Sequence, residues 1–410
     1  MTALVWAISL GAILCILLKP KQWLEAVWAC AGAGLLVAFR LLPVHDAAGA
    51  VAKGLDVYLF LAGMMLLSEV AREEGVFDWL ATHAVHASRG SAERLFALIF
   101  SAGILVTVFL SNDATAVVLT PAVHAAVKKA RAESLPYLFA CALIANAASF
   151  VLPVSNPANL VIYGKALPSL APWLRLFLLP SLASIGVTYA VLRLVSRRAL
   201  SVPIEDNIRM TDLTARGRRV VLGITGTGLV LLAASAAGRS LGVWTLGAAV
   251  LAISVSTGGR GMLPVFRNVS WSVLPLVAGL FMIVEALQHA GALAFGRDAM
   301  AFMEQLPKPA GALTASFGIA ALSNLLNNLP SGLLTGGVTT GAAAPLHLRN
   351  ALLIGVDLGP NLSVTGSLAT ILWLVALRRD GVDVSAARFL RVGLAVMPPA
   401  LLAATLALLI

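Results

Sequence analysis

Charged residues are scarce in this chain. Only 12% of its 410 residues are Asp, Glu, Lys or Arg, whereas about a quarter of an average soluble protein is charged. Hydrophobic residues make up 59%, and the mean hydropathy is +0.92. This composition excludes a soluble globular enzyme, a disordered protein and a fibrous repeat. Many stretches reach the roughly 20 apolar residues that cross a bilayer as a helix. We therefore expect an all-α polytopic membrane protein embedded in the lipid bilayer.

Cysteines and nucleotide-binding motifs are also sparse. The three cysteines, Cys15, Cys30 and Cys141, lie in separate apolar segments without paired spacing, so neither a disulfide framework nor a zinc site is indicated. No G-x-x-x-x-G-K-[ST] motif occurs, so we expect no ATP hydrolysis by this chain. The net charge of +10 is typical of basic cytoplasmic loops and does not indicate nucleic acid. We expect no metal, no cofactor and no enzymatic activity.

Four apolar stretches are too long for one plain span, namely 95–127, 135–167, 309–342 and 346–377. Each contains a polar break. The breaks are Ser-Asn-Asp-Ala-Thr at 111–115, Ser-Asn-Pro-Ala-Asn at 155–159, Asn-Asn-Leu-Pro-Ser at 327–331 and Asp-Leu-Gly-Pro-Asn at 357–361. Backbone without helical hydrogen bonds is tolerated at membrane depth only where protein or a water-filled cavity surrounds it. Four such breaks predict an internal polar site.

The two halves of the sequence repeat. One set of residues recurs with the same spacing in both halves: Gly63, Glu69, Gly75 and Asn112 match Gly279, Glu285, Gly291 and Asn328. A second set surrounds the other breaks: Val154, Ser155, Asn159, Leu160 and Gly164 match Val356, Asp357, Asn361, Leu362 and Gly366. Internal repeats with interrupted helices at corresponding positions indicate a secondary transporter.

The distribution of basic residues predicts the topology. If 95–127 and 309–342 are re-entrant hairpins, most of the 29 Lys and Arg residues fall on one side; if both cross fully, they divide almost evenly. The positive-inside rule therefore favours ten spans and two hairpins. We expect a first repeat at 1–200, a basic cytoplasmic linker at 201–217 and a second, inverted repeat at 218–410. The first hairpin would enter from the cytoplasm and the second from outside.

Uncharged polar side chains fill the four breaks, and we expect them to bind the substrate. They are Ser111, Asn112, Thr115, Asn156, Asn159, Asn327, Asn328, Ser331, Asn361 and Thr365. Helix ends at mid-membrane add free N–H and C=O groups. No Lys or Arg lies within the breaks, which weighs against a dicarboxylate or phosphate and suits a small neutral hydroxylated solute or a cation. The alternative is that these asparagines only cap broken helices.

Four acidic residues are candidates for proton coupling: Asp113, Asp357, Glu69 and Glu285. An acidic side chain inside a membrane is costly and marks an ion or proton pathway. Removal from water disfavours the charged form of a carboxyl group, which can then take up and release protons near neutral pH. The alternatives are a capping carboxylate for the aspartates and a simple charge at the end of a span for Glu69.

The breaks resemble those of the arsenite efflux carriers of the ArsB type, in the ion transporter superfamily. The resemblance rests on Phe-Leu-Ser-Asn-Asp at 109–113, Asn-Asn-Leu-Pro at 327–330 and, most specifically, Gly-Val-Asp-Leu-Gly-Pro-Asn at 355–361 with the segment 365–373. One departure is Ser111, where some relatives carry a second Asn.

The resemblance implies an inner-membrane exporter of arsenite and antimonite, carried as neutral hydroxides in exchange for protons. It also implies a homodimer, and proton exchange acting alone or with a cytoplasmic arsenite-stimulated ATPase. The alternative is a sodium-coupled anion carrier or sodium/proton antiporter of the same superfamily.

Overall fold

The structure is a computed structural model that describes the chain except residues 19, 21, 22, 206, 207, 209, 211, 259–261, 342 and 343. Within the described residues the regular elements are all helical, so the expected all-α fold is confirmed. Lys19, Lys21, Arg209 and Arg260, which contribute to the predicted charge distribution, and parts of the linker 201–217 lie outside the described residues.

The first half contains α1 (Thr2–Leu18), α2 (Glu25–Ala38), α3 (Val44–Lys53), α4 (Leu55–Glu73), α5 (Val76–Ser88), α6 (Ala92–Phe109), η2 (Ala114–Leu119), α7 (Thr120–Lys129), α8 (Ser134–Ala147), η3 (Pro153–Ser155), α9 (Pro157–Tyr163), η4 (Gly164–Ala166) and α10 (Leu170–Val195). After the short α11 (Arg197–Leu200), the second half contains α12 (Ala215–Ala236), α13 (Leu241–Thr257), α14 (Met262–Asn268), α15 (Val273–Leu287), η5 (Gln288–Ala292), α16 (Leu293–Gln305), α17 (Lys308–Leu326), α18 (Asn328–Gly341), α19 (Leu346–Leu358), η6 (Gly359–Asn361), η7 (Val364–Gly366), α20 (Leu368–Arg379) and α21 (Ala386–Ala407).

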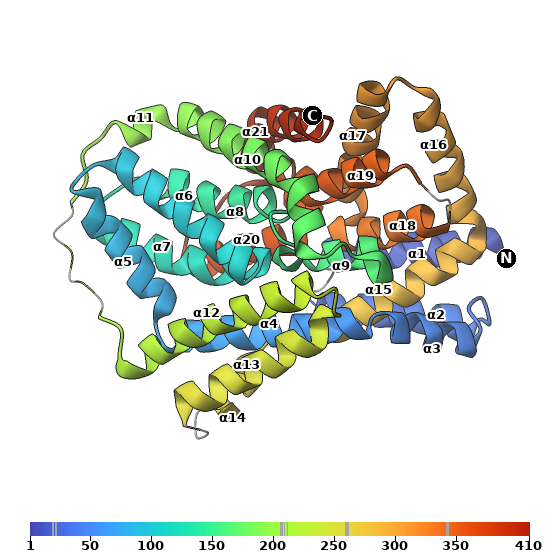
Figure 1. Ribbon diagram of the computed structural model, residues 1–410, viewed down its shortest axis with the longest axis horizontal. Coiled ribbons are helices and arrows are strands. Elements are labelled where there is room, and N and C mark those ends of the chain that lie inside the picture. The colour runs from blue at the N-terminus through green and yellow to red at the C-terminus, as the bar shows by residue number, and fades with distance from the viewer. Residues whose placement is uncertain are drawn as a thin grey trace.

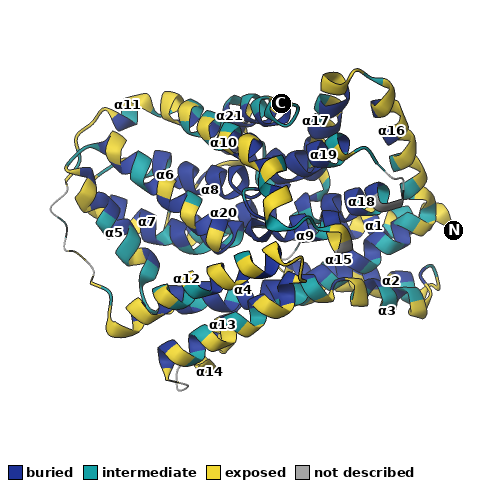
Figure 2. Ribbon diagram, viewed as in Figure 1, coloured by how far each residue is buried: buried dark blue, intermediate teal, exposed yellow. Residues whose placement is uncertain are grey.

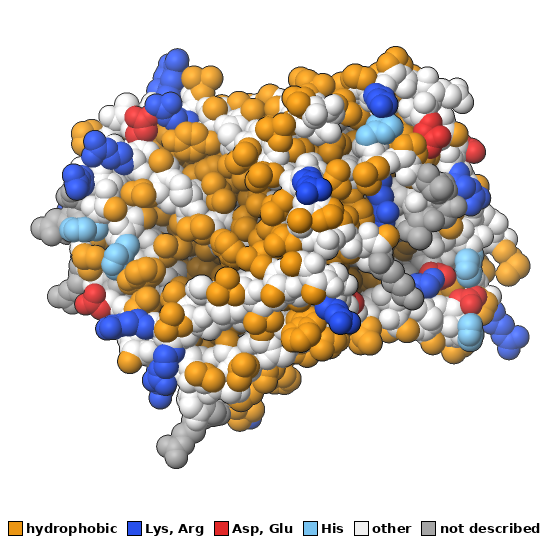
Figure 3. Space-filling model, in the orientation of Figure 1, with side chains coloured by type: hydrophobic (Ala, Val, Ile, Leu, Met, Phe, Trp, Pro, Cys, Tyr) orange, Lys and Arg blue, Asp and Glu red, His pale blue; other side chains and the backbone are white. Residues whose placement is uncertain are grey.

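Several helices are long and apolar enough to cross a bilayer. By length and composition six spans qualify among the described residues, or seven if α3 and α4, which meet at 47°, count as one bent span. Four further apolar helices, α1, α2, α8 and α13, are shorter. Hydrophobic side chains cover the middle of the face shown in Figure 3, and most of the charged side chains lie toward its two ends. The chain is thus a multi-pass membrane protein, and the count of ten spans stays a prediction.

The helices form two packed groups, and each half of the chain contributes to both. In the first group α4 packs on α13, α13 on α12, and α2 on both α1 and α15. In the second group α10 packs on α21, α17 on α19, α9 on α18, and α6 on α8. Figure 1 shows α4, α12 and α13 along the lower edge of the molecule and α10 and α21 along the upper edge.

Two helices at the centre are buried on all sides. In α8 every residue from Pro136 to Ala147 is buried, and in α19 every residue from Asn350 to Leu358 is buried. Figure 2 shows both helices enclosed by their neighbours. A helix that is apolar all round packs inside a protein, and each of these two leads directly into one of the four breaks.

The repeated glycines have the same structural role in both halves. A Cβ added at Gly63 would lie 2.8 Å from the backbone of Thr245 and Leu246, and one added at Gly279 would lie 2.8 Å from the backbone of Ala29. Both positions therefore allow close helix packing, a common use of small residues in membranes. Gly75 and Gly291 both have positive φ, of 70° and 96°, which favours glycine. Close packing at Gly63 and Gly279 and positive φ at Gly75 and Gly291 explain why glycine recurs at these positions.

We expect Gly63→Ala to lower the stability of the protein even though alanine is the better helix former. The added methyl would push α4 away from α13, and such overpacking costs about 1–3 kcal/mol. The control is Gly247→Ala on α13, where an added Cβ meets nothing within 4 Å. The measurement is the midpoint of thermal unfolding in detergent. Equal midpoints for the two variants would contradict the close-packing role of Gly63.

Candidate functional site

The four polar breaks lie close together inside the molecule. The first hairpin breaks at residues 110–113, between α6 and η2, and the second at Asn327, between α17 and α18. The other two breaks separate α8 from α9 and α19 from α20. Contacts link them across the halves: η2 packs on α20, η6 on α8, and α9 on α18. Residues from all four breaks therefore surround one central region.

Asp357 joins the two halves of the chain through hydrogen bonds. Its side chain is fully buried. One carboxylate oxygen accepts a hydrogen bond from Ser149 Oγ at 2.8 Å, and the other accepts one from Asn156 Nδ2 at 2.8 Å. Asn156 also caps α9, because its Oδ1 accepts a hydrogen bond from Ala158 N at 3.0 Å. The capping role that was the alternative for the break asparagines is therefore present at Asn156, and substrate binding by this residue stays a prediction.

Buried amides extend this network. Asn146 Nδ2 donates to Asn361 Oδ1 at 3.0 Å, and Asn361 Nδ2 donates to Leu143 O at 2.9 Å. Asn159 Nδ2 donates to Ser149 O at 2.9 Å. Asn159 thereby satisfies a backbone carbonyl past the end of α8, where the helical hydrogen bonds stop, and Asn361 adds a bond to a carbonyl near the end of that helix. Sequence reasoning missed Asn146 and Ser149; the available signal was a polar side chain inside the otherwise apolar stretch 135–167.

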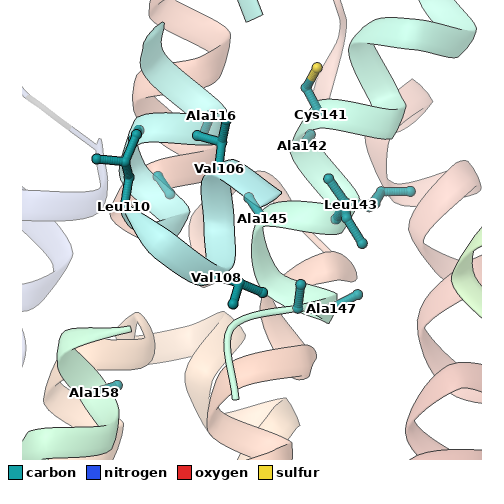
Figure 4. Close-up of a cluster of buried hydrophobic side chains, with 14 of the residues drawn as sticks. Val106, Val108, Leu110, Ala116, Cys141, Ala142, Leu143, Ala145, Ala147 and Ala158 are labelled. Carbon is teal, nitrogen blue, oxygen red and sulfur yellow. The ribbon is translucent and has the colours of Figure 1, made fainter. Parts of the chain in front are cut away.

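The tip of the first hairpin is organised by its own polar side chains. Ser111 Oγ accepts a hydrogen bond from Ala114 N at 3.1 Å, and Asn112 Oδ1 accepts one from Asp113 N at 2.9 Å. The hydroxyls of Thr107 and Thr115 lie 2.8 Å apart and tie the two arms together. Valines of this hairpin pack beside alanines of α8 (Figure 4).

The tip of the second hairpin is held by the break that follows α19. Asn327 has a φ of 80°, and its Nδ2 donates to Thr365 O at 3.4 Å. Thr365 Oγ1 donates to Asn324 O at 2.9 Å, and Ser331 Oγ donates to Asn327 O at 2.9 Å. Sequence reasoning also missed Asn324, because it precedes the recognised break at 327–331 by three positions.

A pocket lies beside the first hairpin tip, and we call it the acidic pocket. Its walls come from α4, η2, α9, α15 and α20, and it encloses about 750 Å³ including space open to solvent. Asp113 and Glu69 both line it, together with Ser111. No Lys or Arg is among the described residues that line it. Exposed Asn268 and Ser270 form part of its rim, so the pocket reaches the surface there.

The two repeated glutamates are paired with basic residues. Glu69 forms an ion pair with Arg72, one turn along α4. Glu285 accepts hydrogen bonds from Lys53 Nζ at 2.9 and 2.7 Å, and His289 Nε2 lies 3.7 Å from its Oε1. Glu69 also lines the acidic pocket, whereas Glu285 does not. Proton coupling by these two residues stays a prediction.

The predicted site residues thus divide into three places. Ser111, Asp113 and Glu69 line the acidic pocket. Asn156, Asn159 and Asn361 belong to the network around Asp357. The remaining predicted residues hold or border the hairpin tips, except for Glu285, which lies apart and pairs with Lys53. Those at the tips are Asn112, Thr115, Asn327, Asn328, Ser331 and Thr365.

Comparisons with known proteins agree with this architecture. A family model described as a citrate transporter, CitMHS, matches residues 12–360. Arsenical pump membrane proteins of Escherichia coli and Yersinia enterocolitica are each 27% identical, over 355 and 358 residues, with 82% of this chain and 82% of the relative covered. An uncharacterized transporter of Mycobacterium tuberculosis is 27% identical over 408 residues, covering 92% of this chain and 90% of its own.

Two solved structures share the fold at low sequence identity. The YdaH transporter of Alcanivorax borkumensis superposes with a TM-score of 0.59 at 15% identity, covering 88% of this chain and 86% of its own. MtrF of Neisseria gonorrhoeae, described among antimetabolite efflux pumps, gives 0.53 at 12% identity, covering 92% and 84%.

Broken helices meeting inside an apolar body, together with these likenesses, define a multi-pass membrane transporter and not an enzyme. The family model spans most of the chain, so the protein belongs to the citrate transporter family of the ion transporter superfamily. The resemblance to arsenite efflux carriers is confirmed by the arsenical pump relatives.

We expect Asp357→Leu to destabilise the protein strongly. The change leaves the buried Asn156 Nδ2 without its acceptor, at about 1–3 kcal/mol for an unsatisfied group. It also removes the Ser149 bond across the halves, while Ser149 Oγ keeps the carbonyl of Asn146 as an acceptor. Asp357→Asn keeps one acceptor oxygen and should lose less. The control is Asn328→Ala, which removes a buried amide that makes no hydrogen bond within the described part of the chain. Thermal unfolding in detergent gives the comparison, and an equal midpoint for Asp357→Leu and Asn328→Ala would refute the linking role.

Proposed function

We propose that this transporter exports arsenite and antimonite, as neutral hydroxides, in exchange for protons. The observation that carries the proposal is the charge of the acidic pocket. Its two charged lining residues among those described, Asp113 and Glu69, are both acidic. Glu69 is paired with Arg72, which is not among the residues that line the pocket. A citrate anion would therefore meet the Asp113 carboxylate with no basic side chain among the described lining residues, whereas a neutral triol or a proton would meet no such repulsion.

The hydrogen-bonding groups of the pocket suit a small hydroxylated solute. Ser111 and Asp113 line it, and Pro157 places the first turn of α9 at its wall. That helix start contributes partial positive charge, while its Ala158 N–H is already bonded to Asn156. The Ser111 hydroxyl can donate to the oxygen atoms of As(OH)3, and the carboxylates accept hydrogen bonds from its hydroxyls. The apolar remainder of the wall excludes larger polar solutes.

Asp113 is the proton carrier in this proposal. It is the aspartate that lines the pocket, whereas Asp357 is enclosed by the network that links the halves. Asp113 would take up a proton when the pocket faces outside and release it when the pocket faces the cytoplasm. The metalloid would bind on the cytoplasmic side and leave on the outside. Alternating access follows if the helices that bear the hairpins move against the other group. Asp357 would keep the two broken helices together during that movement.

The resemblance to the arsenite efflux carriers supports further expectations of the same proposal. These are location in the inner membrane, a homodimer, and proton exchange acting alone or with a cytoplasmic arsenite-stimulated ATPase. We also propose that the two repeats are inverted relative to each other and that the two hairpins enter the membrane from opposite sides. The repeated roles of Gly63 with Gly279 and of Gly75 with Gly291 support equivalent halves.

The test is proton release from everted membrane vesicles that are energised to be acid inside. We expect addition of arsenite or antimonite to the wild-type protein to release protons. Asp113→Asn should abolish this release, because the amide cannot exchange a proton. The control is Asp298→Asn, an exposed aspartate on α16, which should behave as wild type at an equal amount of protein in the membrane.

The same vesicles separate the competing functions. Proton release with sodium, and none with either metalloid, would assign the protein to sodium/proton exchange. Uptake of labelled citrate that requires sodium would assign it to anion transport. Full metalloid-driven release by Asp113→Asn would remove Asp113 from the coupling mechanism.

A further inference from the structure

A second pocket lies beside the tip of the second hairpin, and we call it the apolar pocket. It measures about 390 Å³ including space open to solvent, and its walls come from α1, α15, the tip between α17 and α18, and α20. Nearly all of its lining is aliphatic; Asn327 is the polar residue among the described residues that line it. Most of these residues are buried, so this pocket is more enclosed than the acidic pocket.

The two pockets follow one face of α15. Val273 lines the acidic pocket, and Leu276 and Leu280 line the apolar pocket. These residues are three, four and seven positions apart, which places them on the same face of a helix. From Val273 to Leu280 the helix rises about 10 Å. The pockets therefore lie one after the other along the helix, each at the tip of a different hairpin.

Leu368 is the residue that the two pockets share among the described residues that line them. It occupies the first position of α20, directly after the break in the second half. On the next turn of the same face, Ile371 lines only the apolar pocket and Leu372 only the acidic pocket. The side chain of Leu368 thus stands where the two spaces meet.

The position of Leu368 is fixed by the preceding residues. Ser367 Oγ accepts a hydrogen bond from Thr370 N at 3.1 Å and caps α20. A Cβ added at Gly366 would lie 2.5 Å from Pro360 Cα, so the chain passes there in close contact. Asn327 at the second hairpin tip bonds to Thr365 O. Movement of that tip would therefore be transmitted to the segment that carries Leu368.

We propose that Leu368 is the barrier between the two pockets, an apolar plug that prevents water and protons from passing between them. Narrow apolar constrictions close pathways by excluding water. A proton antiporter needs such a barrier, because a continuous water path beside Asp113 would dissipate the gradient that drives export. The inference rests on the proposed function, but its test uses protons alone and can fail independently of the choice of solute.

The experiment measures proton flux in proteoliposomes containing the full-length protein, a pH-sensitive dye inside and an imposed potassium diffusion potential, without metalloid or sodium. We expect Leu368→Ala to raise the proton flux several-fold above that of the wild type, because a smaller side chain opens the junction to water. Leu368→Met keeps the volume and should retain the low flux.

The matched controls lie on the same helix. Ile371→Ala enlarges only the apolar pocket, and Leu374→Ala removes a buried side chain of α20 that is in the lining of neither pocket, so both should keep the wild-type flux. Equal leaks in all three alanine variants would overturn the proposal, because general loosening of α20 would then be the cause. A wild-type flux in Leu368→Ala would also overturn it. If Leu368→Ala does not fold, Leu368→Thr, which removes less volume and adds a hydroxyl, tests the same expectation.

Discussion

The structure depends on one constraint, which is that backbone groups freed by a broken helix need hydrogen-bond partners when water is excluded. Side-chain amides satisfy this constraint at the centre of the molecule. Asn159 and Asn361 donate to carbonyl groups around the end of α8, and Asn156 accepts from the first turn of α9. Since Asn156 and Asn361 also bond across the halves, the same residues serve the local backbone and the assembly of the two halves.

Sequence patterns revealed the breaks because polar residues are conspicuous in apolar stretches. They also revealed the repeat, since close packing at Gly63 and Gly279 and positive φ at Gly75 and Gly291 constrain residue choice strongly. The hydrogen-bond partners of the acidic residues could not be predicted from the sequence. Ser149 lies 208 positions from Asp357 and Lys53 lies 232 from Glu285, and no local pattern predicts such distant pairs. The position of Leu368 between two pockets could not be predicted for another reason. One leucine among many in an apolar sequence is not distinctive until the pockets beside it are known.

The four acidic residues singled out in the sequence have different surroundings in the structure. Asp357 is enclosed and bonded on both oxygens, whereas Asp113 faces a pocket that reaches the surface. Glu69 and Glu285, at equivalent positions, each pair with a cation close to the end of a helix. Sequence reasoning grouped these four acids because their cost in a membrane is similar. Their surroundings, set by tertiary packing, distinguish Asp113, which lines the pocket, from Glu69, which lines it but pairs with Arg72, and from the acids that lie outside it.

The link between Asp357 and the first half has a consequence for biogenesis. The ribosome completes Asn146, Ser149 and Asn156 long before residue 357 is synthesised. During that interval the first half enters the membrane with polar side chains whose final partners do not yet exist. These groups must stay near water, pair with one another, or be shielded by the insertion machinery. The central helices α8 and α19 can therefore reach their final packing only after the second half has been inserted.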